Sequence, residues 1–128
     1  MRRHLANGIG FLLIAVTLSF TFSEGTNATQ WFDDYGPIPW NEEKLRLDNF
    51  AIHLLRHKEM KGYIALYRGE GDSKGSLESR VERIRKHLVV TRGVPTNRLV
   101  FVPRPDVKER RWTILQPVLE SIQPPQFP

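Results

Sequence analysis

The chain has 128 residues, of which 40% are hydrophobic and 26% are charged, so it has room for one domain and is too apolar to be disordered throughout. It contains no cysteine, which excludes disulfides, thiolate metal ligands and a cysteine nucleophile. The formal net charge is +5, a value that by itself suggests a nucleic acid or another polyanion as partner.

The first 23 residues have the layout of a secretory signal peptide. Arg2 and Arg3 precede an apolar run of 14 residues at positions 9–22, and small and polar residues follow. The run is shorter than the roughly 20 residues that span a bilayer, so we expect cleavage after Ser23 rather than a retained anchor. If the segment is not cleaved, it is the one contact with a membrane that the sequence suggests.

Cleavage changes the charge balance. Loss of Arg2 and Arg3 leaves 17 basic and 14 acidic residues, a net charge of +3. This charge is too mild to require a nucleic-acid partner, and export also separates the protein from the genome. An exported domain without cysteine is typical of a bacterial envelope rather than of a disulfide-rich eukaryotic module. We therefore expect a periplasmic, cell-envelope location.

Composition divides the mature chain into three parts. Residues 24–30 are polar and are expected to form a flexible leader. The domain itself is expected over residues 31–118. The proline-rich tail at 119–128 is expected to be unordered.

The first half of the domain alternates between strand and helix. A short strand at 31–34 and a turn with two prolines at 35–39 precede an amphipathic helix at 41–58, for which Asn41 is the expected N-cap. A buried strand is expected at 62–67, an apolar run between glycines. The apolar stripe of the helix consists of Leu47, Phe50, Ala51, Leu54 and Leu55.

A second helix follows a polar loop. The loop at 68–76 contains three glycines, and the helix is expected at 77–91, with Ser76 as its N-cap. Gly93 occupies the position where a helix C-terminus prefers glycine.

Two further strands are expected near the end of the domain. The first covers residues 99–102 and ends at the prolines of segment 103–106, and the second covers residues 111–115 and ends at Pro117. The elements then follow the order βαβαββ. This order predicts an α+β fold, a two-layer sandwich with two helices on one face of a mixed sheet.

Short motifs at matching places in this order carry a family resemblance. They are Phe32-Asp33, Leu47-Asp48, Tyr67, Leu77-Glu78-Ser79-Arg80, His87-Leu88, Gly93-Val94 and Asn97-Arg98-Leu99-Val100. Together they resemble the OmpA-like C-terminal domain, the peptidoglycan-associating module of bacterial envelope proteins, in the form of a divergent small exported member.

The resemblance implies a ligand site around Arg80. Family members hold the diaminopimelate residue of a peptidoglycan stem peptide with an arginine in the second helix and an aspartate in the preceding loop. Arg80 matches the arginine and Tyr67 the aromatic residue before the loop. The aspartate position is taken by arginine and glycine, so Glu70 or Asp72 would have to receive the ligand's ammonium group instead.

Two functions follow from this resemblance. The first is a non-catalytic envelope protein that binds peptidoglycan through Arg80 with a degenerate acidic partner. The second is an envelope module for protein–protein interaction that has lost peptidoglycan binding. No cofactor is implied, and no nucleophile beside a base or phosphate-binding loop is recognisable, so we expect no enzymatic activity.

Other clusters have ordinary explanations. His53 and His57 lie four residues apart, a spacing that suits a metal ion, but they flank the apolar stripe and lack the glutamate of a metalloprotease motif. We therefore expect no metal site. A basic face toward anionic wall polymer or lipid is an alternative to plain solvation for Arg80, Arg83, Arg85, Lys86, Lys108, Arg110 and Arg111.

Overall fold

The computed structural model describes residues 30–128, so the expected signal peptide at 1–23 and leader residues 24–29 lie outside the described residues. Within residues 30–128, no helix combines the length and apolar character needed to cross a membrane. The elements, in order, are β1 (Asp33–Tyr35), α2 (Trp40–Arg56), β2 (Met60–Gly69), α3 (Ser76–Arg85), the π-helix η2 (Lys86–Thr91), the 3-10 helix η3 (Thr96–Arg98), β3 (Leu99–Lys108) and β4 (Trp112–Leu119).

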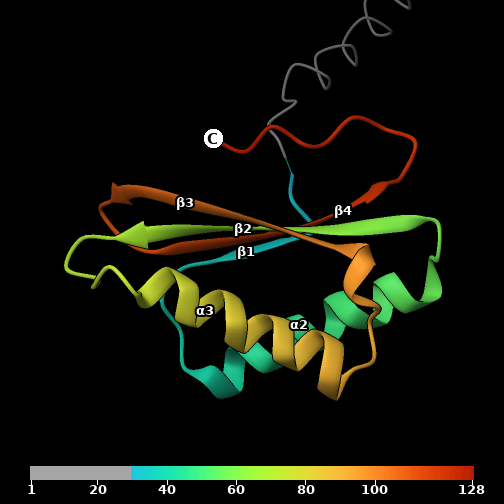
Figure 1. Ribbon diagram of the computed structural model, residues 1–128, viewed down its shortest axis with the longest axis horizontal. Coiled ribbons are helices and arrows are strands. Elements are labelled where there is room, and N and C mark those ends of the chain that lie inside the picture. The colour runs from blue at the N-terminus through green and yellow to red at the C-terminus, as the bar shows by residue number, and fades with distance from the viewer. Residues whose placement is uncertain (1–29) are drawn as a thin grey trace, which may run out of the picture. The chain divides into compact units, whose positions relative to one another are not determined.

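The four strands form one mixed sheet in the order β1-β4-β2-β3. β2 runs parallel to β3 and antiparallel to β4, and β1 pairs antiparallel with β4. Parallel neighbours need a long crossover connection, which α3 and η2 supply. Figure 1 shows both helices on the same face of the sheet. The predicted α+β class, with two helices layered on a mixed sheet, is therefore confirmed.

The main core lies between this helical layer and the sheet. Leu47, Phe50 and Leu54 of α2 are fully buried in one cluster with Ile64 and Leu66 of β2. Burial of each such side chain stabilises the fold by about 1.5–3 kcal/mol. The same cluster contains the apolar residues of the second helical segment, Leu77, Ile84 and Leu88.

One predicted member of the α2 stripe is not in the core. Leu55 is 40% exposed, so the prediction that it belongs to the buried stripe is wrong. It follows the buried Leu54 directly, and one residue turns a helix by about 100°, which carries Leu55 away from the sheet.

The predicted N-caps, Asn41 and Ser76, are also wrong. Pro39 precedes α2, and its carbonyl accepts two N–H groups of the first turn at 3.0 Å. The proline ring fixes φ near −65°, and the extended ψ of 150° completes a backbone geometry that needs no side-chain cap. Gly75 precedes α3, which makes Ser76 the first helical residue.

The predicted helix at 77–91 is divided into two segments. Regular α-helix ends at Arg85, and the chain continues as the π-helix η2, in which His87 and Leu88 are buried. Gly93 ends the segment as predicted, with φ of +78° and its N–H bound to the carbonyl of Val89 at 3.1 Å.

The last two strands are longer than predicted because each has an open side. β3 is an edge strand, so Pro103 and Pro105 do not end it, and a register shift in its pairing with β2 accommodates the irregularity. β4 continues through Pro117 because β1 pairs only with residues 113–115. On these open sides no neighbouring strand requires a backbone N–H group, so a proline is tolerated there.

The first two strands also differ from their predicted limits. β1 covers 33–35 rather than 31–34, and β2 covers 60–69 rather than 62–67. Consequently Arg68 belongs to the strand and not to the loop. Strand ends follow the length of the paired neighbour more than the preferences of single residues.

The face of the sheet opposite the helices carries a smaller cluster. Buried Ala65, Tyr67 and Ile114 form its centre. Figure 1 shows the chain after β4 returning across this face. The tail is predicted to be unordered, but Phe127 packs against this cluster, so for this part of the tail the prediction is wrong.

Candidate functional site

Arg80 is buried at the junction of α3 with the sheet. Its guanidinium donates to the carbonyl of Tyr67 at 3.0 Å, the carbonyl of Trp112 at 3.2 Å and the hydroxyl of Thr113 at 3.0 Å. Only 6% of the residue is exposed. Burial, followed by the charge of Arg111, lowers the pKa of Arg80 from its usual value. The side chain thus connects α3 to both β2 and β4.

The cleft beside Arg80 is small and strongly polar. Glu43, itself buried, accepts from the hydroxyl of Tyr35 at 2.7 Å and from Arg83 at 3.3 Å. Burial, together with the Glu43 carboxylate, raises the pKa of Tyr35. The cavity that these residues line with Arg80 and Arg111 has a volume of about 20 Å³. A cavity of this size accommodates about one water molecule and no amino acid.

The structure brings only one of the proposed acidic partners into a defined position. Asp72 accepts from the N–H of Gly69 and from Arg111, both at 2.8 Å. The Gly69 hydrogen bond is the largest of the effects that lower the pKa of Asp72, and Arg111 adds to it. Glu70 is exposed and makes no ion pair within residues 30–128.

Tyr67 contributes to the Arg80 site through its backbone only. Its carbonyl accepts from Arg80, whereas its ring belongs to the cluster on the opposite face of the sheet. This division follows from the alternation of side chains along β2, in which the neighbouring Leu66 faces the helices.

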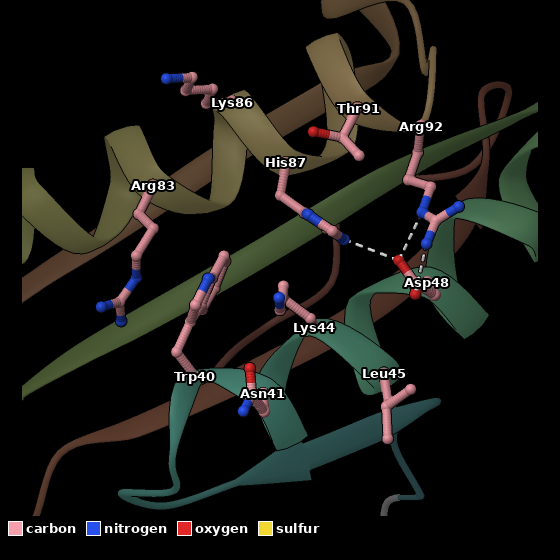
Figure 2. Close-up of a pocket in the computed structure, with 10 residues that line it drawn as sticks. All are labelled: Trp40, Asn41, Lys44, Leu45, Asp48, Arg83, Lys86, His87, Thr91 and Arg92. Carbon is pink, nitrogen blue, oxygen red and sulfur yellow. Dashed lines mark hydrogen bonds and ion pairs between the residues drawn. The ribbon is translucent and has the colours of Figure 1, made fainter.

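A larger groove, of about 800 Å³, runs between α2 and the α3–η2 segment. Figure 2 shows Trp40, Lys44 and Asp48 extending from α2 toward side chains of the other segment. Arg83 lies over the Trp40 ring at 4.6 Å, and the ring of His87 meets the same indole edge-on at 5.6 Å.

Asp48 holds one end of this groove together. Its carboxylate contacts Nε2 of His87 at 2.7 Å and accepts from Arg92 at 2.6 and 2.7 Å (Figure 2). Burial acts to raise the pKa of Asp48, but the hydrogen bonds from Arg92 and His87 outweigh it and lower that pKa. Sequence reasoning missed this cluster, because His87 and Arg92 lie far from Asp48 in the chain.

The middle of the groove has unpaired positive charge. Lys44 and Lys86 line it, and neither makes an ion pair within residues 30–128. Arg83 adds a third cation, half-exposed and shared with Glu43. An arrangement of this kind binds carboxylate or phosphate groups without first breaking an internal ion pair.

The remaining members of the predicted basic face are dispersed. Arg80 is buried, Arg111 is bound to Asp72, and Arg85 pairs with Glu82 while lying over the ring of Phe101. Of the seven predicted residues, only Arg83 and Lys86 line the inter-helix groove.

Two pairs of neighbouring titratable side chains complete the description of the site residues. The rings of His53 and His57 lie 4.5 Å apart, but within residues 30–128 no group of three or more potential ligands could hold a metal ion. Asp33 pairs with Arg46 at 2.6 Å, while Asp34 accepts from an indole at 3.1 Å, so the two neighbouring carboxylates have separate partners.

No protein-family model matches the chain, and no curated protein matches it.

Proposed function

We propose that this chain is a non-catalytic protein of the bacterial cell envelope whose OmpA-like domain is a protein-interaction module that has lost peptidoglycan binding. The motif order described above supports the family, and two helices on one face of a mixed sheet agree with what the resemblance implies. The signal-like segment at residues 1–23 supports the location.

The observation that carries this proposal is the internal use of Arg80. Three of the five N–H donors of the guanidinium bind Tyr67, Trp112 and Thr113, and only 6% of the residue is exposed, so a stem-peptide carboxylate would have to compete with these hydrogen bonds for a buried group. A hydrogen bond from a charged donor contributes about 1.5–3 kcal/mol. Access to Arg80 would also require the cleft of about 20 Å³ to open. Arg80 therefore acts as a structural residue that joins α3 to the sheet.

The inter-helix groove supplies the interaction surface. Its cations Lys44 and Lys86 have no internal partner in the described part of the chain, and the surface is concave, so it suits a protein segment that presents carboxylates. Trp40 offers an aromatic wall beside them. Aromatic residues next to arginine are typical of interface hot spots.

Two assays with the exported protein test the proposal. Co-sedimentation with isolated sacculi should leave the protein in the supernatant. Crosslinking in envelope fractions should capture one protein partner, and the double variant Lys44→Glu/Lys86→Glu should reduce that capture at least about tenfold. The matched control, Lys58→Glu/Lys74→Glu, makes the same charge change at exposed positions outside the groove. Sedimentation with sacculi, or equal loss in both double variants, would contradict the proposal.

A second candidate, peptidoglycan binding, is favoured by one feature of the Arg80 cleft. The side chains of Arg83 and Arg111 line the cleft beside Arg80 and are 47% and 40% exposed, and Arg111 also contacts the Asp72 carboxylate. In this case a diaminopimelate-containing stem peptide should bind saturably, and Arg83→Ala or Arg111→Ala should weaken it about tenfold or more. No saturable binding would eliminate this candidate.

A further inference from the structure

The face of the sheet opposite the helices is aromatic and is covered by the chain's own tail. Phe127 stacks on Trp31 with ring centroids 5.2 Å apart and an interplanar angle of 27°. The hydroxyl of Tyr67 donates to the carbonyl of Pro128. Figure 1 shows this final segment crossing the sheet on the side away from α2 and α3.

The tail packs on residues of the two central strands, β2 and β4. Ala65 and Tyr67 of β2 and Ile114 of β4 are buried there, and Trp112 packs beside them. Tyr67 is only 4% exposed although no helix of residues 30–128 covers this face. The tail therefore helps to cover this face of the sheet, as the helices cover the other face.

The tail leaves part of this face unfilled. A cavity of about 370 Å³ lies next to Pro128, and Tyr67 and Trp112 line it together with charged residues of the β3–β4 connection. Arg104 and Lys108 lie over the Tyr67 ring at 5.5 and 5.7 Å. The face thus has space beside Pro128 that the tail does not fill.

The chemistry of the occupant is specific. Residues 123–128 read Gln-Pro-Pro-Gln-Phe-Pro. Prolines have a preset φ and no N–H, so proline-rich segments dock on aromatic surfaces at a small entropic penalty. Within residues 30–128, the segment adds no strand to the sheet, and its attachment consists of the Phe127 stack, the Pro128 hydrogen bond and apolar contact. A segment held in this way separates without breaking the sheet.

We propose that this face is a binding site for proline-rich segments that carry an aromatic residue, and that residues 123–128 occupy it as a displaceable intramolecular strap. A segment tethered by a few residues has an effective concentration in the millimolar range. A segment of another protein must compete with the tail, so the strap raises the partner concentration that is needed for binding. The site uses none of the groove cations and goes beyond the function proposed above.

The test compares the full chain with a variant that lacks residues 123–128. The probe is a synthetic peptide of residues 120–128, followed by the fluorescence of Trp31 and Trp112 and by chemical-shift changes on β2 and β4. The deletion variant should bind the peptide saturably, and the full chain should bind it at least about tenfold more weakly. A peptide with Phe127→Ala should bind neither protein measurably.

A full-length Phe127→Ala variant keeps the test valid if the deletion impairs folding. This variant loses the stack on Trp31 but keeps all residues of the tail. It should bind the wild-type peptide more tightly than the wild-type protein does. Equal affinity in all three proteins, or no binding to any, would overturn the proposal. Concentration-dependent dimerisation of the full chain that disappears on deletion would also overturn it, because the tail would then serve a second copy. Lys44→Glu/Lys86→Glu should leave peptide binding unchanged, which separates this test from that of the groove.

Discussion

Arg80 and Asp48 are charged side chains that the fold fixes through several hydrogen bonds each. Arg80 joins α3 to the ends of β2 and β4, and Asp48 joins α2 to η2. The family resemblance draws attention to both positions, but their partners give them structural roles. At the residue scale, what a charged group does depends on which neighbours satisfy it.

Replacement of Arg80 tests its structural role. Arg80→Ala leaves two backbone carbonyls and the Thr113 hydroxyl without their donor, and we expect a loss of about 3 kcal/mol in the free energy of unfolding. The control is Arg83→Ala, at a half-exposed site, with an expected loss below about 1 kcal/mol. Urea unfolding measures both values. Similar losses in the two variants would contradict a special role for Arg80.

Asp48 makes stability depend on pH in a defined direction. Because hydrogen bonds lower its pKa in the folded state, the carboxylate stabilises the protein above the unfolded-state value of about 4, and this contribution is lost as the pH falls through the lower folded-state value. Asp72 acts in the same direction.

Asp48→Asn removes this titration. The stability difference between wild type and Asp48→Asn should therefore be largest near neutral pH and should shrink below about pH 4. Urea unfolding at several pH values measures it, with Asp106→Asn at an exposed position as the control. A stability difference that stays constant from neutral pH to below about pH 4 would show that the Asp48 charge does not contribute to the free energy of unfolding.

At the scale of elements, α2 packs against β2 closely at a glycine. A Cβ atom on Gly62 would lie 2.7 Å from Cδ1 of Leu54 and 3.0 Å from ring atoms of Phe50. Both of these side chains are fully buried, so an added methyl group would have to shift them within the packed core. The contact between this helix and this strand therefore depends on the absence of a side chain at position 62.

Gly62→Ala should consequently reduce the free energy of unfolding by about 1–3 kcal/mol, the usual range for overpacking a core. Gly75→Ala is the matched control, since its Cβ would meet nothing within 4 Å and its φ of −84° suits alanine. The control should be neutral or slightly stabilising. Thermal or urea unfolding compares them, and an equal effect of the two substitutions would contradict the close approach of α2 and β2.

At the scale of the whole domain, the two faces of the sheet are covered in different ways. The helices α2 and α3 bury the larger cluster on one face, while the tail and Trp31 shield the smaller aromatic cluster on the other. The helical layer is held by many fully buried side chains, whereas the tail is held by few contacts. This asymmetry leaves two surfaces with different chemistry: a cationic groove between helices and an aromatic face under a proline-rich segment.

The amino-acid sequence was sufficient for the α+β class, the two amphipathic helices and the stop at Gly93. These features depend on local periodicity and on backbone preferences of single residues, which the sequence displays directly. The limits of β3 and β4 were not predictable in the same way. Whether Pro105 or Pro117 ends a strand depends on whether its missing N–H faces a neighbouring strand.

The same distinction applies to the candidate sites. The family resemblance singled out Arg80 as a candidate ligand-binding arginine of the second helix, and the sequence placed Asp72 in the preceding loop. Only the tertiary structure decided that carbonyls of β2 and β4 satisfy Arg80, that Asp48 meets His87 and that the tail covers the sheet. Such contacts join residues 13 to 61 positions apart, and their free energies depend on neighbours that no local pattern specifies.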